Sequence, residues 1–297
     1  MPANVLTLED GLTRLTLAPE TGGSIVNWTV LSSGQPLLRH SSDEAVAAGT
    51  PRKLALYPLA PWSNRIGDGG FDTPDGWFAL SPNSANDALP IHGSAWQQPW
   101  DVIEQTDSHV CLKLDSQIPF AYQARLRYTL LDGRLSIELS TTHLDSRAAW
   151  HGLGLHPYLP RTPETYLQAK ASQVWLCDEA GLPTELQALP DEWDFRNGNS
   201  LPHAKLDNGF TEWDGRSIIR QPDLGYELHC EASGSGSGSG SGSEYFLVFC
   251  PPGLDFFCFE PVSHPVNAHH LPGHPGLKLL QRGESMTLAF SLLYRAL

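Results

Sequence analysis

Alternating apolar residues on either side of Asp-Gly turns constrain the fold of this chain more than any other feature. In the stretch RLRYTLLDGRLSIELS, Leu126, Tyr128 and Leu130 occupy every second position. The chain then turns at Asp132-Gly133, and the same alternation resumes. A period of two is typical of a strand with one buried face, and Asp-Gly favours the two-residue turn of a β-hairpin. The stretch therefore predicts two antiparallel strands joined by a tight turn.

Similar runs occur along most of the chain. The stretches NVLTLEDGLTRLTLAP at 4–19 and VIEQTDSHVCLKLD at 102–115 predict two further hairpins. The runs at 226–232 and 244–252 predict the two strands of a fourth hairpin. Short strands that recur with turns at close intervals favour two packed sheets over a layered α/β arrangement.

Helix signals are few. Residues 41–49 begin with a Ser cap and early acidic residues and end at a Gly, and residues 191–195 predict one more short turn. We therefore expect an all-β fold: a large antiparallel β-sandwich with few short helices, forming one domain over residues 1–297.

One segment is low in complexity. Residues 233–243 read SGSGSGSGSGS and contain no apolar side chain that a core could bury. We expect a flexible loop between two strands, without a role in chemistry. The sequence leaves open whether this loop is natural or engineered.

The charge balance disfavours two classes of partner. The chain has 33 acidic and 19 basic residues, a formal net charge of -14, which disfavours nucleic acid and anionic membranes. Its first residues lack the basic and apolar regions of a signal peptide, and it contains no apolar run of about 18 residues. The five cysteines have no CxxC spacing, so we expect reduced thiols and a cytoplasmic protein.

Three polar stretches stand out as candidate sites. PWSNRIGDGGF places Asn64 and Arg65 before a glycine-rich turn, which suits a cation held at a fixed angle toward a polar ligand. LPIHGSAW contains His92 just before a turn, and GLGLHPYLP contains His156 in a glycine-punctuated strand. Each histidine taken alone is equally compatible with a hydrogen-bonded core residue.

Glu260 is the most unusual of the candidates. It follows the aromatic run FFCF and precedes a proline, so the strand that carries it is predicted to be buried. A buried carboxyl needs hydrogen-bond partners or a function. It could pair with an arginine at a strand end, or apolar surroundings could raise its pKa to suit a general base.

A histidine-rich tail follows this strand. His264, His269, His270 and His274 lie in a segment with several prolines, which we interpret as a surface loop because no nearby acid or cysteine completes a zinc-ligand pattern. The chain has no GxSxG, P-loop or GxGxxG in the required context. We therefore expect neither a metal nor a cofactor.

Taken together, the motifs resemble those of the aldose 1-epimerase (galactose mutarotase) family. In chain order they are NRIGDGGF, IHG, LHPYL, KLDNGF, CFEP and the closing QRGESMTLAFSLLYR. The resemblance extends from about residue 5 to the C-terminus. It implies a large antiparallel β-sandwich, in agreement with the hairpin pattern.

The resemblance also implies roles for individual residues. Glu260 would take the proton of the C1 hydroxyl of a hexose such as galactose or glucose, and His156 would protonate the ring oxygen O5. Arg65, His92 and Asp207 would hold sugar oxygens, with Asn64 beside them in the same motif. Such an isomerase needs no cofactor, because one proton is removed and another added on the same small molecule.

Other functions remain open from the sequence. A hexose-6-phosphate mutarotase would need two or more arginines at the cleft, for which Arg161 and Arg216 are candidates besides Arg65. A glycoside hydrolase or lyase could use Asp207 and Glu260 as paired carboxylates. A non-catalytic carbohydrate-binding protein would need exposed aromatic residues but no buried acid and base. A monomer and a homodimer are equally compatible with the sequence.

Overall fold

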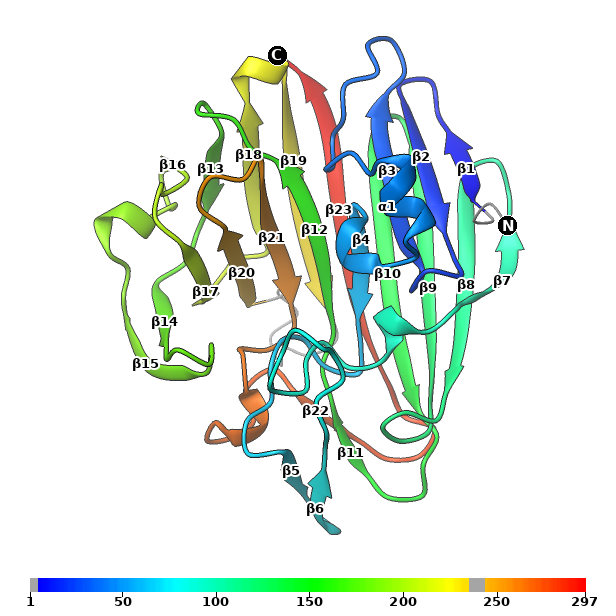
Figure 1. Ribbon diagram of the computed structural model, residues 1–297, viewed down its shortest axis with the longest axis vertical. Helices are drawn as coiled ribbons and strands as arrows, with labels where there is room; N and C mark the ends of the chain where they lie inside the picture. The colour runs from blue at the N-terminus through cyan, green and yellow to red at the C-terminus, as the bar shows by residue number, and fades with distance from the viewer. Residues whose placement is uncertain (1–4, 235–243) are drawn as a thin grey trace.

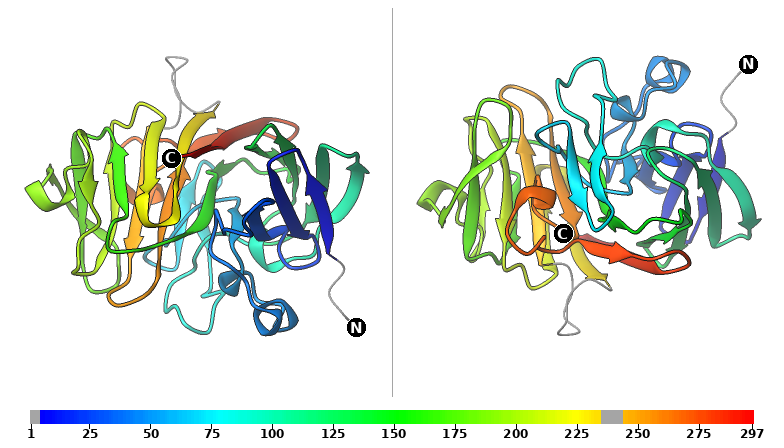
Figure 2. Two further views of the ribbon diagram at one scale, coloured as in Figure 1. Left: turned by 90° about the horizontal axis from the view of Figure 1, so that it is seen from above. Right: turned by 90° about the horizontal axis from the view of Figure 1, so that it is seen from below.

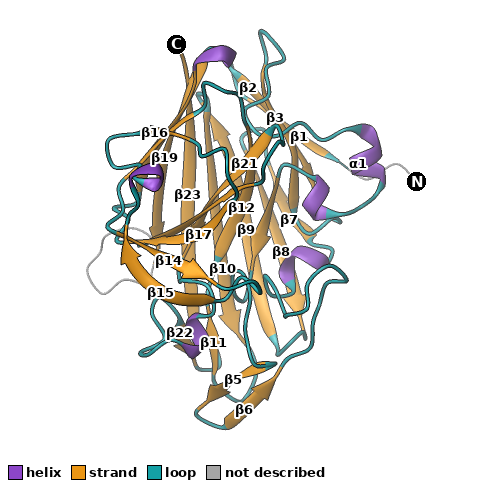
Figure 3. Cartoon of the chain, turned by 60° about the vertical axis from the view of Figure 1, so that its left-hand side comes forward, coloured by secondary structure: helices purple, strands orange, loops and turns teal. Residues whose placement is uncertain are grey.

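Two large antiparallel sheets dominate the computed structural model, which describes residues 5–234 and 244–297 (Figure 1). Within these ranges one sheet has ten strands and the other has nine. Helices are confined to short segments, visible as the few purple turns in Figure 3. The predicted all-β sandwich with few short helices is confirmed.

The ten-stranded sheet carries the strands that matter for the candidate site. In spatial order its described strands are β1 (Leu6–Glu9), β2 (Thr13–Ala18), β3 (Ser24–Val30), β4 (Leu56–Leu59), β12 (Gly154–Pro160), β21 (Phe256–Val262), β20 (Tyr245–Cys250), β17 (Leu206–Thr211), β14 (Gln173–Cys177) and β15 (Pro183–Ala188). The middle of this sheet thus combines segments from the beginning, middle and end of the chain.

The nine-stranded sheet faces it across the core (Figure 2). In spatial order its described strands are β16 (Asn199–Ser200), β13 (Tyr166–Ala169), β18 (Arg216–Gln221), β19 (Tyr226–Gly234), β23 (Ser285–Ala296), β10 (Arg134–His143), β9 (Tyr122–Leu131), β8 (His109–Ser116) and β7 (Asp101–Gln105). Sequential hairpins build one end of this sheet, as the alternating pattern predicts.

The remaining elements are small. Two strand pairs lie apart from the large sheets: β5 (Gly70–Thr73) with β6 (Gly76–Ala79), and β11 (Ala149–His151) with β22 (Lys278–Leu280). The helical segments are α1 (Asp43–Ala47) and the 3-10 turns η1 (Pro51–Lys53), η2 (Ala95–Gln97), η3 (Asp191–Trp193), η4 (Pro222–Leu224) and η5 (Ala268–His270). Among the described residues, no helix has both the length and the apolar character needed to cross a membrane.

Local sequence signals correctly predict three hairpins and the helix. Asp132 and Gly133 both have positive φ, 51° and 74°, as the primed turn between β9 and β10 requires. The Ser42 side chain accepts a hydrogen bond from the backbone N–H of Ala45 and so caps α1. The hairpins β1–β2 and β7–β8 also form where they are predicted.

The fourth predicted hairpin is wrong. Strand β19 pairs with β18 and β23, whereas β20 pairs with β17 and β21, so the chain passes from one sheet to the other between them. β19 alternates and β20 is apolar throughout, and neither pattern specifies which sheet the strand joins. Of the predicted Ser-Gly loop, Ser233 and Gly234 end β19, and residues 235–243 lie outside the described part of the chain.

The core lies between the two sheets, and strand β21 shows how it is made. Phe257 and Phe259 belong to this core, whereas Cys258 packs in a separate cluster on the other side of the sheet. Alternation thus places Glu260 on the same side as Cys258, away from the sandwich core. A hydrogen bond of 2.6 Å from the Tyr128 hydroxyl to the Gly23 carbonyl adds a polar link across the core.

Candidate active site

A cavity of about 190 Å³ lies on the outer side of the ten-stranded sheet, where loops cover its central strands. Its walls are formed by Arg52, Tyr57, Asn64, Arg65, Asp87, Ile91, His92, His156, Tyr158, Asp207, Phe249 and Glu260. All six residues that the sequence singled out as catalytic or substrate-binding candidates are among them. A cavity of this size matches a small polar molecule rather than a polymer.

Adjacent strands bring the polar residues of the cavity floor together. His156 on β12 is paired in register with Tyr57 on β4, and Asp207 on β17 is paired with Phe249 on β20. Glu260 on β21 pairs with Leu247 of β20 on one side, and β21 pairs with β12 on the other. Because alternate side chains share one face, residues far apart in the sequence meet above these strands.

The centre of the cavity is a buried carboxyl-imidazole pair. His156 Nε2 lies 3.3 Å from Glu260 Oε1, and the two side chains are only 9% and 3% exposed. The imidazole stacks against both Tyr57 and Tyr158, with ring centroids 4.7 and 4.8 Å away. Glu260 Oε2 and His156 Nδ1 have no hydrogen-bond partner among the described residues. Buried polar atoms left in this state favour a polar ligand.

Burial moves the pKa values of this pair in opposite directions. It raises the pKa of Glu260 well above its usual value, with Asp207 adding to the rise and Arg65 opposing it. It lowers the pKa of His156 to about 3, with Arg52 and Arg39 adding to the fall. Burial therefore favours the neutral form of both groups, in which the pair holds one mobile proton on the carboxyl.

The loops above the sheet fix a second imidazole through reciprocal hydrogen bonds. The backbone N–H of Asn64 donates to His92 Nδ1, and the backbone N–H of His92 donates to the Asn64 carbonyl, both at 3.0 Å. Because Nδ1 accepts, the ring proton of neutral His92 must be on Nε2. Burial also lowers the pKa of His92 well below its usual value. His92 thus offers the cavity a hydrogen-bond donor.

Backbone strain accompanies this arrangement. Asn64 and His92 both have left-handed conformations, with φ of 57° and 61°. This is unfavourable for histidine, and such strain concentrates at functional sites. Gly93 follows with φ of 63°, and a Cβ there would lie 2.1 Å from the Ala60 carbonyl oxygen. A glycine is therefore required for the His92 loop to pack against the end of β4.

Asp87 is a polar residue of the site that sequence reasoning missed. Its two carboxylate oxygens accept hydrogen bonds from two arginines, at 2.7 Å from Arg52 and 3.2 Å from Arg65. Arg65 also donates to the Asn64 side-chain oxygen, from its backbone N–H at 2.9 Å and its guanidinium at 3.3 Å. Asn64 and Asp87 together hold the Arg65 side chain. The asparagine before Arg65 therefore serves to fix the direction of its guanidinium.

Asp207 completes the polar lining from the opposite side. Burial raises the pKa of its carboxyl, while the positive charges of Arg65 and Lys205 act against this rise. Lys205 Nζ lies 3.6 Å from Asp207 Oδ2. Across the cavity, the charges of Arg52 and Arg65 are matched by those of Asp87 and Asp207. The other arginines proposed from the sequence lie elsewhere: Arg161 binds backbone carbonyls, and Arg216 is on the opposite sheet.

The histidine-rich tail is not the surface loop that was predicted. His264 and His269 are 1% and 3% exposed. His264 Nε2 accepts a hydrogen bond of 3.0 Å from the backbone N–H of Ser63, and its Nδ1–H donates to the Pro265 carbonyl at 2.7 Å. A Cβ on Gly152 would lie 2.1 Å from the His264 ring, so this glycine permits the contact. His264 thus supports the loop that carries Asn64.

One donor set inside the cavity could bind a metal ion. A side-chain donor atom from each of His156, Cys258 and Glu260 lies within 4.8 Å of the other two. Burial raises the pKa of the Cys258 thiol well above its usual value, which favours the protonated thiol over the thiolate that binds metals. The expectation of a site without metal remains a prediction. All five cysteines are free.

A buried carboxyl-imidazole pair surrounded by fixed hydrogen-bond donors and acceptors, in a small cavity on a β-sandwich, is typical of an enzyme that acts on a small polar molecule. The family model of aldose 1-epimerases matches residues 4–293 of the chain. The chain therefore belongs to the aldose 1-epimerase family.

Individual relatives agree with this assignment. The uncharacterized protein YphB of Escherichia coli K12 is 31% identical over 296 residues, covering 97% of this chain and 98% of its own. A crystal structure from E. coli K12 that carries a provisional aldose 1-epimerase assignment matches with a TM-score of 0.91 at 30% identity, covering 99% of both chains. A galactose mutarotase-like protein from Clostridium acetobutylicum has the same fold, with a TM-score of 0.85 at 20% identity, covering 99% of this chain and 95% of its own.

Proposed function

We propose that this protein is a mutarotase, an isomerase that interconverts the α and β anomers of a free hexose such as galactose or glucose. The observation that carries the proposal is the buried Glu260–His156 pair, 3.3 Å apart, at the centre of a cavity of about 190 Å³. Mutarotation needs one group to accept a proton and one to donate a proton, both within reach of C1 and O5 of one sugar.

The reaction moves protons without transferring any other group. Glu260 accepts the proton of the C1 hydroxyl while His156 donates a proton to O5, and the C1–O5 bond breaks to give the open-chain aldehyde. Rotation about C1–C2 turns the other face of the aldehyde toward the O5 hydroxyl. On ring closure that hydroxyl returns its proton to His156, and Glu260 returns a proton to O1, which gives the opposite anomer.

The proton count of the pair fits this cycle. The neutral pair and the ion pair contain the same single mobile proton, so the ion pair can form by transfer from Glu260 to His156. Burial favours the neutral form, and sugar hydroxyls that donate to Glu260 would stabilise its carboxylate form. In this proposal substrate binding therefore creates the base and the acid together.

The other wall residues bind and orient the sugar. Arg65 and His92 donate hydrogen bonds to the ring and hydroxyl oxygens, and Asp207 accepts hydrogen bonds from hydroxyl groups. Asn64 acts through Arg65, whose backbone and guanidinium both donate to the Asn64 side-chain oxygen. The flat ring of Phe249 in the wall suits the CH face of a sugar ring, whereas the ring of Tyr158 already packs against Arg39 and His156.

A second candidate substrate is a hexose 6-phosphate. Two arginines, Arg52 and Arg65, line the cavity, which is the number that this alternative requires. Asp87 already occupies both guanidinium groups, and Asp207 adds a further negative charge. We favour the unphosphorylated sugar because Asp87 already offsets the positive charge of both arginines, which weakens their attraction for a phosphate.

Anomer exchange tests both candidates. Freshly dissolved α-galactose, α-glucose and α-glucose 6-phosphate are followed by polarimetry and NMR exchange spectroscopy with the intact protein and with Glu260→Gln. We expect faster exchange of a free hexose, and loss of the acceleration in the variant. Acceleration confined to the phosphorylated sugar would favour the second candidate. Binding of sugars without accelerated exchange would contradict catalysis and indicate a carbohydrate-binding protein.

A further inference from the structure

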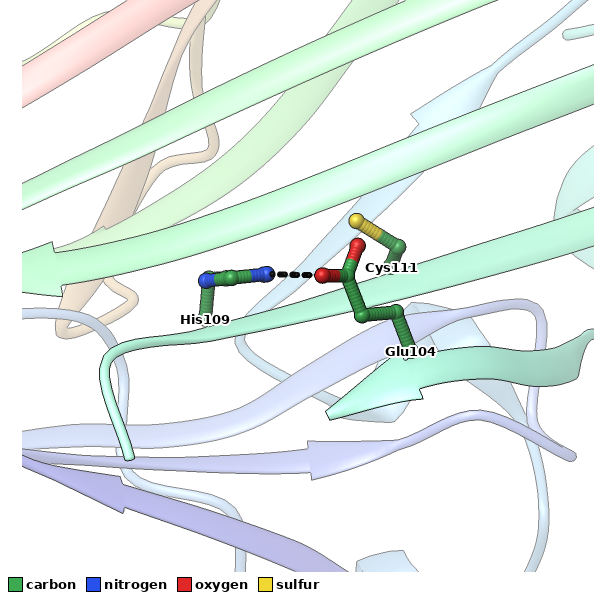
Figure 4. A group of neighbouring side chains, drawn as sticks. All are labelled: Glu104, His109 and Cys111. Carbon is green, nitrogen blue, oxygen red and sulfur yellow. Dashed lines mark ion pairs between the residues drawn. The ribbon is translucent and has the colours of Figure 1, made fainter. Parts of the chain in front are cut away.

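Three potential metal ligands of different chemistry lie together on the hairpin β7–β8 of the nine-stranded sheet. The candidate active site lies on the other sheet. Donor atoms of Glu104, His109 and Cys111 are all within 4.8 Å of one another (Figure 4). Glu104 comes from β7 (Asp101–Gln105), whereas His109 and Cys111 come from β8 (His109–Ser116). Neither the proposed mutarotation nor the family comparison uses any of them.

The geometry of the hairpin explains why these side chains meet. His109 and Cys111 are two residues apart on one strand, so they project from the same face, while Val110 between them is buried in the core. A bulge between Val102 and Glu104 shifts the register so that Glu104 lies directly opposite Cys111. Without this extra residue Glu104 would project from the other face of the sheet.

His109 is oriented as a metal-binding imidazole would be. Its Nδ1 lies 2.9 Å from the Thr106 hydroxyl oxygen, a partner of the kind that fixes the ring of a ligating histidine. Its Nε2 points toward Glu104 Oε1 at 3.1 Å, yet it has no aligned hydrogen bond among the described residues. The atom that would bind a metal is thus buried, close to a carboxylate and without a hydrogen bond that satisfies it.

Neighbouring charges are compatible with a divalent cation. Arg127 on β9 is paired in register with Cys111, and Glu138 on β10 is paired in register with Arg127. The positive charge next to the cluster is therefore followed by a negative one on the same face. A divalent ion bound by one thiolate, one carboxylate and one neutral imidazole forms an uncharged centre.

We propose that Glu104, His109 and Cys111 form a zinc site with a water molecule as the fourth ligand. A thiolate, an imidazole and a carboxylate are the ligand types that Zn²⁺ combines in proteins. In tetrahedral zinc sites sulfur and nitrogen ligands lie about 3.5 Å apart, so side-chain rotations of about 1 Å would bring these atoms to coordination distance. Partial burial and the neighbouring Glu104 raise the pKa of the Cys111 thiol, though not well above its usual value as for the fully buried Cys258, and zinc binding releases the thiol proton to solvent without a change in oxidation state.

Such a site would tie an edge strand to its neighbour. Strand β7 is the last strand of the nine-stranded sheet, and all five of its residues are exposed. An ion bridging Glu104 on β7 with Cys111 on β8 crosslinks the two strands next to the turn of the hairpin. The expected role is therefore structural, independent of the mutarotase proposal.

Cobalt spectroscopy tests the proposal with the full chain kept reduced. Co²⁺ is titrated into the protein, and a thiolate-to-cobalt charge-transfer band is expected, which Zn²⁺ should then abolish by displacement. The band should disappear in Cys111→Ser, and Glu104→Gln should weaken Zn²⁺ binding at least about tenfold. Zn²⁺ should also raise the melting temperature of the unsubstituted protein but not that of Cys111→Ser.

Cys177→Ser is the matched control, because Cys177 is a half-buried cysteine on the other sheet. This variant should retain the band and the affinity. Absence of a charge-transfer band in the unsubstituted protein would overturn the proposal. A band that survives in Cys111→Ser would do the same, because the ion would then be bound by another thiol.

Discussion

The outer faces of the two large sheets differ in the solvent exposure of their ionisable side chains. The ten-stranded sheet has a covered cavity of about 190 Å³ in which Glu260 is 3% exposed. The nine-stranded sheet has an open groove of about 690 Å³, where Arg216 and Glu231 are 80% and 57% exposed and 3.9 Å apart. The ionisable side chains of the larger groove are thus exposed to solvent. The smaller cavity instead buries a carboxyl and an imidazole at its centre.

This difference indicates where chemistry can occur. Solvent screens exposed ion pairs, so they contribute at most about 1 kcal/mol and perturb each other's protonation little. Burial raises the pKa of Glu260 and lowers that of His156 because neither charged form is well solvated. In the proposed mutarotation, a carboxyl and an imidazole act as an acid-base pair because loops cover them, and not because of composition alone.

The largest expected effect comes from removing the buried carboxylate. Glu260→Gln should lower kcat for anomer exchange by about 10²–10⁴-fold, the usual contribution of one general base. Glu231→Gln on the open face should leave kcat unchanged and alter the free energy of unfolding by no more than about 0.5 kcal/mol. Polarimetry and urea unfolding measure both quantities. Equal activity of the two variants would contradict the proposal that the reaction takes place only on the face of the ten-stranded sheet.

Asp87 offers a test of binding rather than of proton transfer. Asp87→Asn removes the charge that holds Arg52 and Arg65, at distances of 2.7 and 3.2 Å. Hydrogen bonds to charged groups contribute about 1.5–3 kcal/mol, so KM should rise about tenfold or more while kcat changes little. Glu138→Gln, in the open groove, should change neither. A large fall in kcat with constant KM would place Asp87 among the reacting groups instead.

Substitution of His264 tests whether a buried side chain next to the cavity loops also contributes to the free energy of unfolding. His264→Ala leaves the Ser63 N–H without its 3.0 Å hydrogen bond and should lower the free energy of unfolding by about 2–4 kcal/mol. The matched change is His229→Ala, on the solvent-facing side of β19, where the imidazole pairs with Glu227. That variant should lose less than about 1 kcal/mol. Similar losses in urea unfolding would contradict the comparison.

The smallest expected effect is that of pH on the reaction. Burial lowers the pKa of His156 to about 3, so a second proton joins the pair only as pH falls toward that value. Between pH 7 and about pH 5 the pair keeps one proton, and kcat/KM should remain constant. Measuring exchange at several pH values tests this. A change in kcat/KM within this range would mean that the pair gains or loses a proton there, and it would contradict this expectation.

Local parts of the fold could be predicted from the sequence because their causes are local. The turn at Asp132-Gly133 and the cap at Ser42 are specified by a few adjacent residues. The passage of the chain between β19 and β20 was not predictable, since the choice of sheet depends on partners elsewhere in the sequence.

The candidate site follows the same rule. Motifs with distinctive neighbours, such as Glu260 after its aromatic run, could be found, and their resemblance to a family ordered them. Arg52 and Asp87 have no such context: one lies in a short 3-10 turn and the other in the loop between β6 and η2. Their importance arises from their ion pair with each other and from the contact of Asp87 with Arg65. The burial of His264 likewise depends on Gly152, more than 100 residues earlier in the chain.

The hydrogen bond between the Asn64 N–H and His92 Nδ1 has a consequence for how a ligand must lie. It leaves His92 able only to give a proton toward the cavity, as Arg52 and Arg65 also do, whereas Glu260 and Asp207 on the strand side can receive. The cavity is therefore polarised: the loops present donors, whereas the sheet presents the acceptors Glu260 and Asp207 beside the proton-donating His156. In the proposed mutarotation a ring oxygen, which has no hydrogen, must lie next to the donors His92 and His156, whose ring centroids are 5.3 Å apart, so that the anomeric hydroxyl can meet Glu260. In the proposed reaction, the orientation of the sugar therefore follows first from which of its oxygens can donate a hydrogen bond, and only then from its shape.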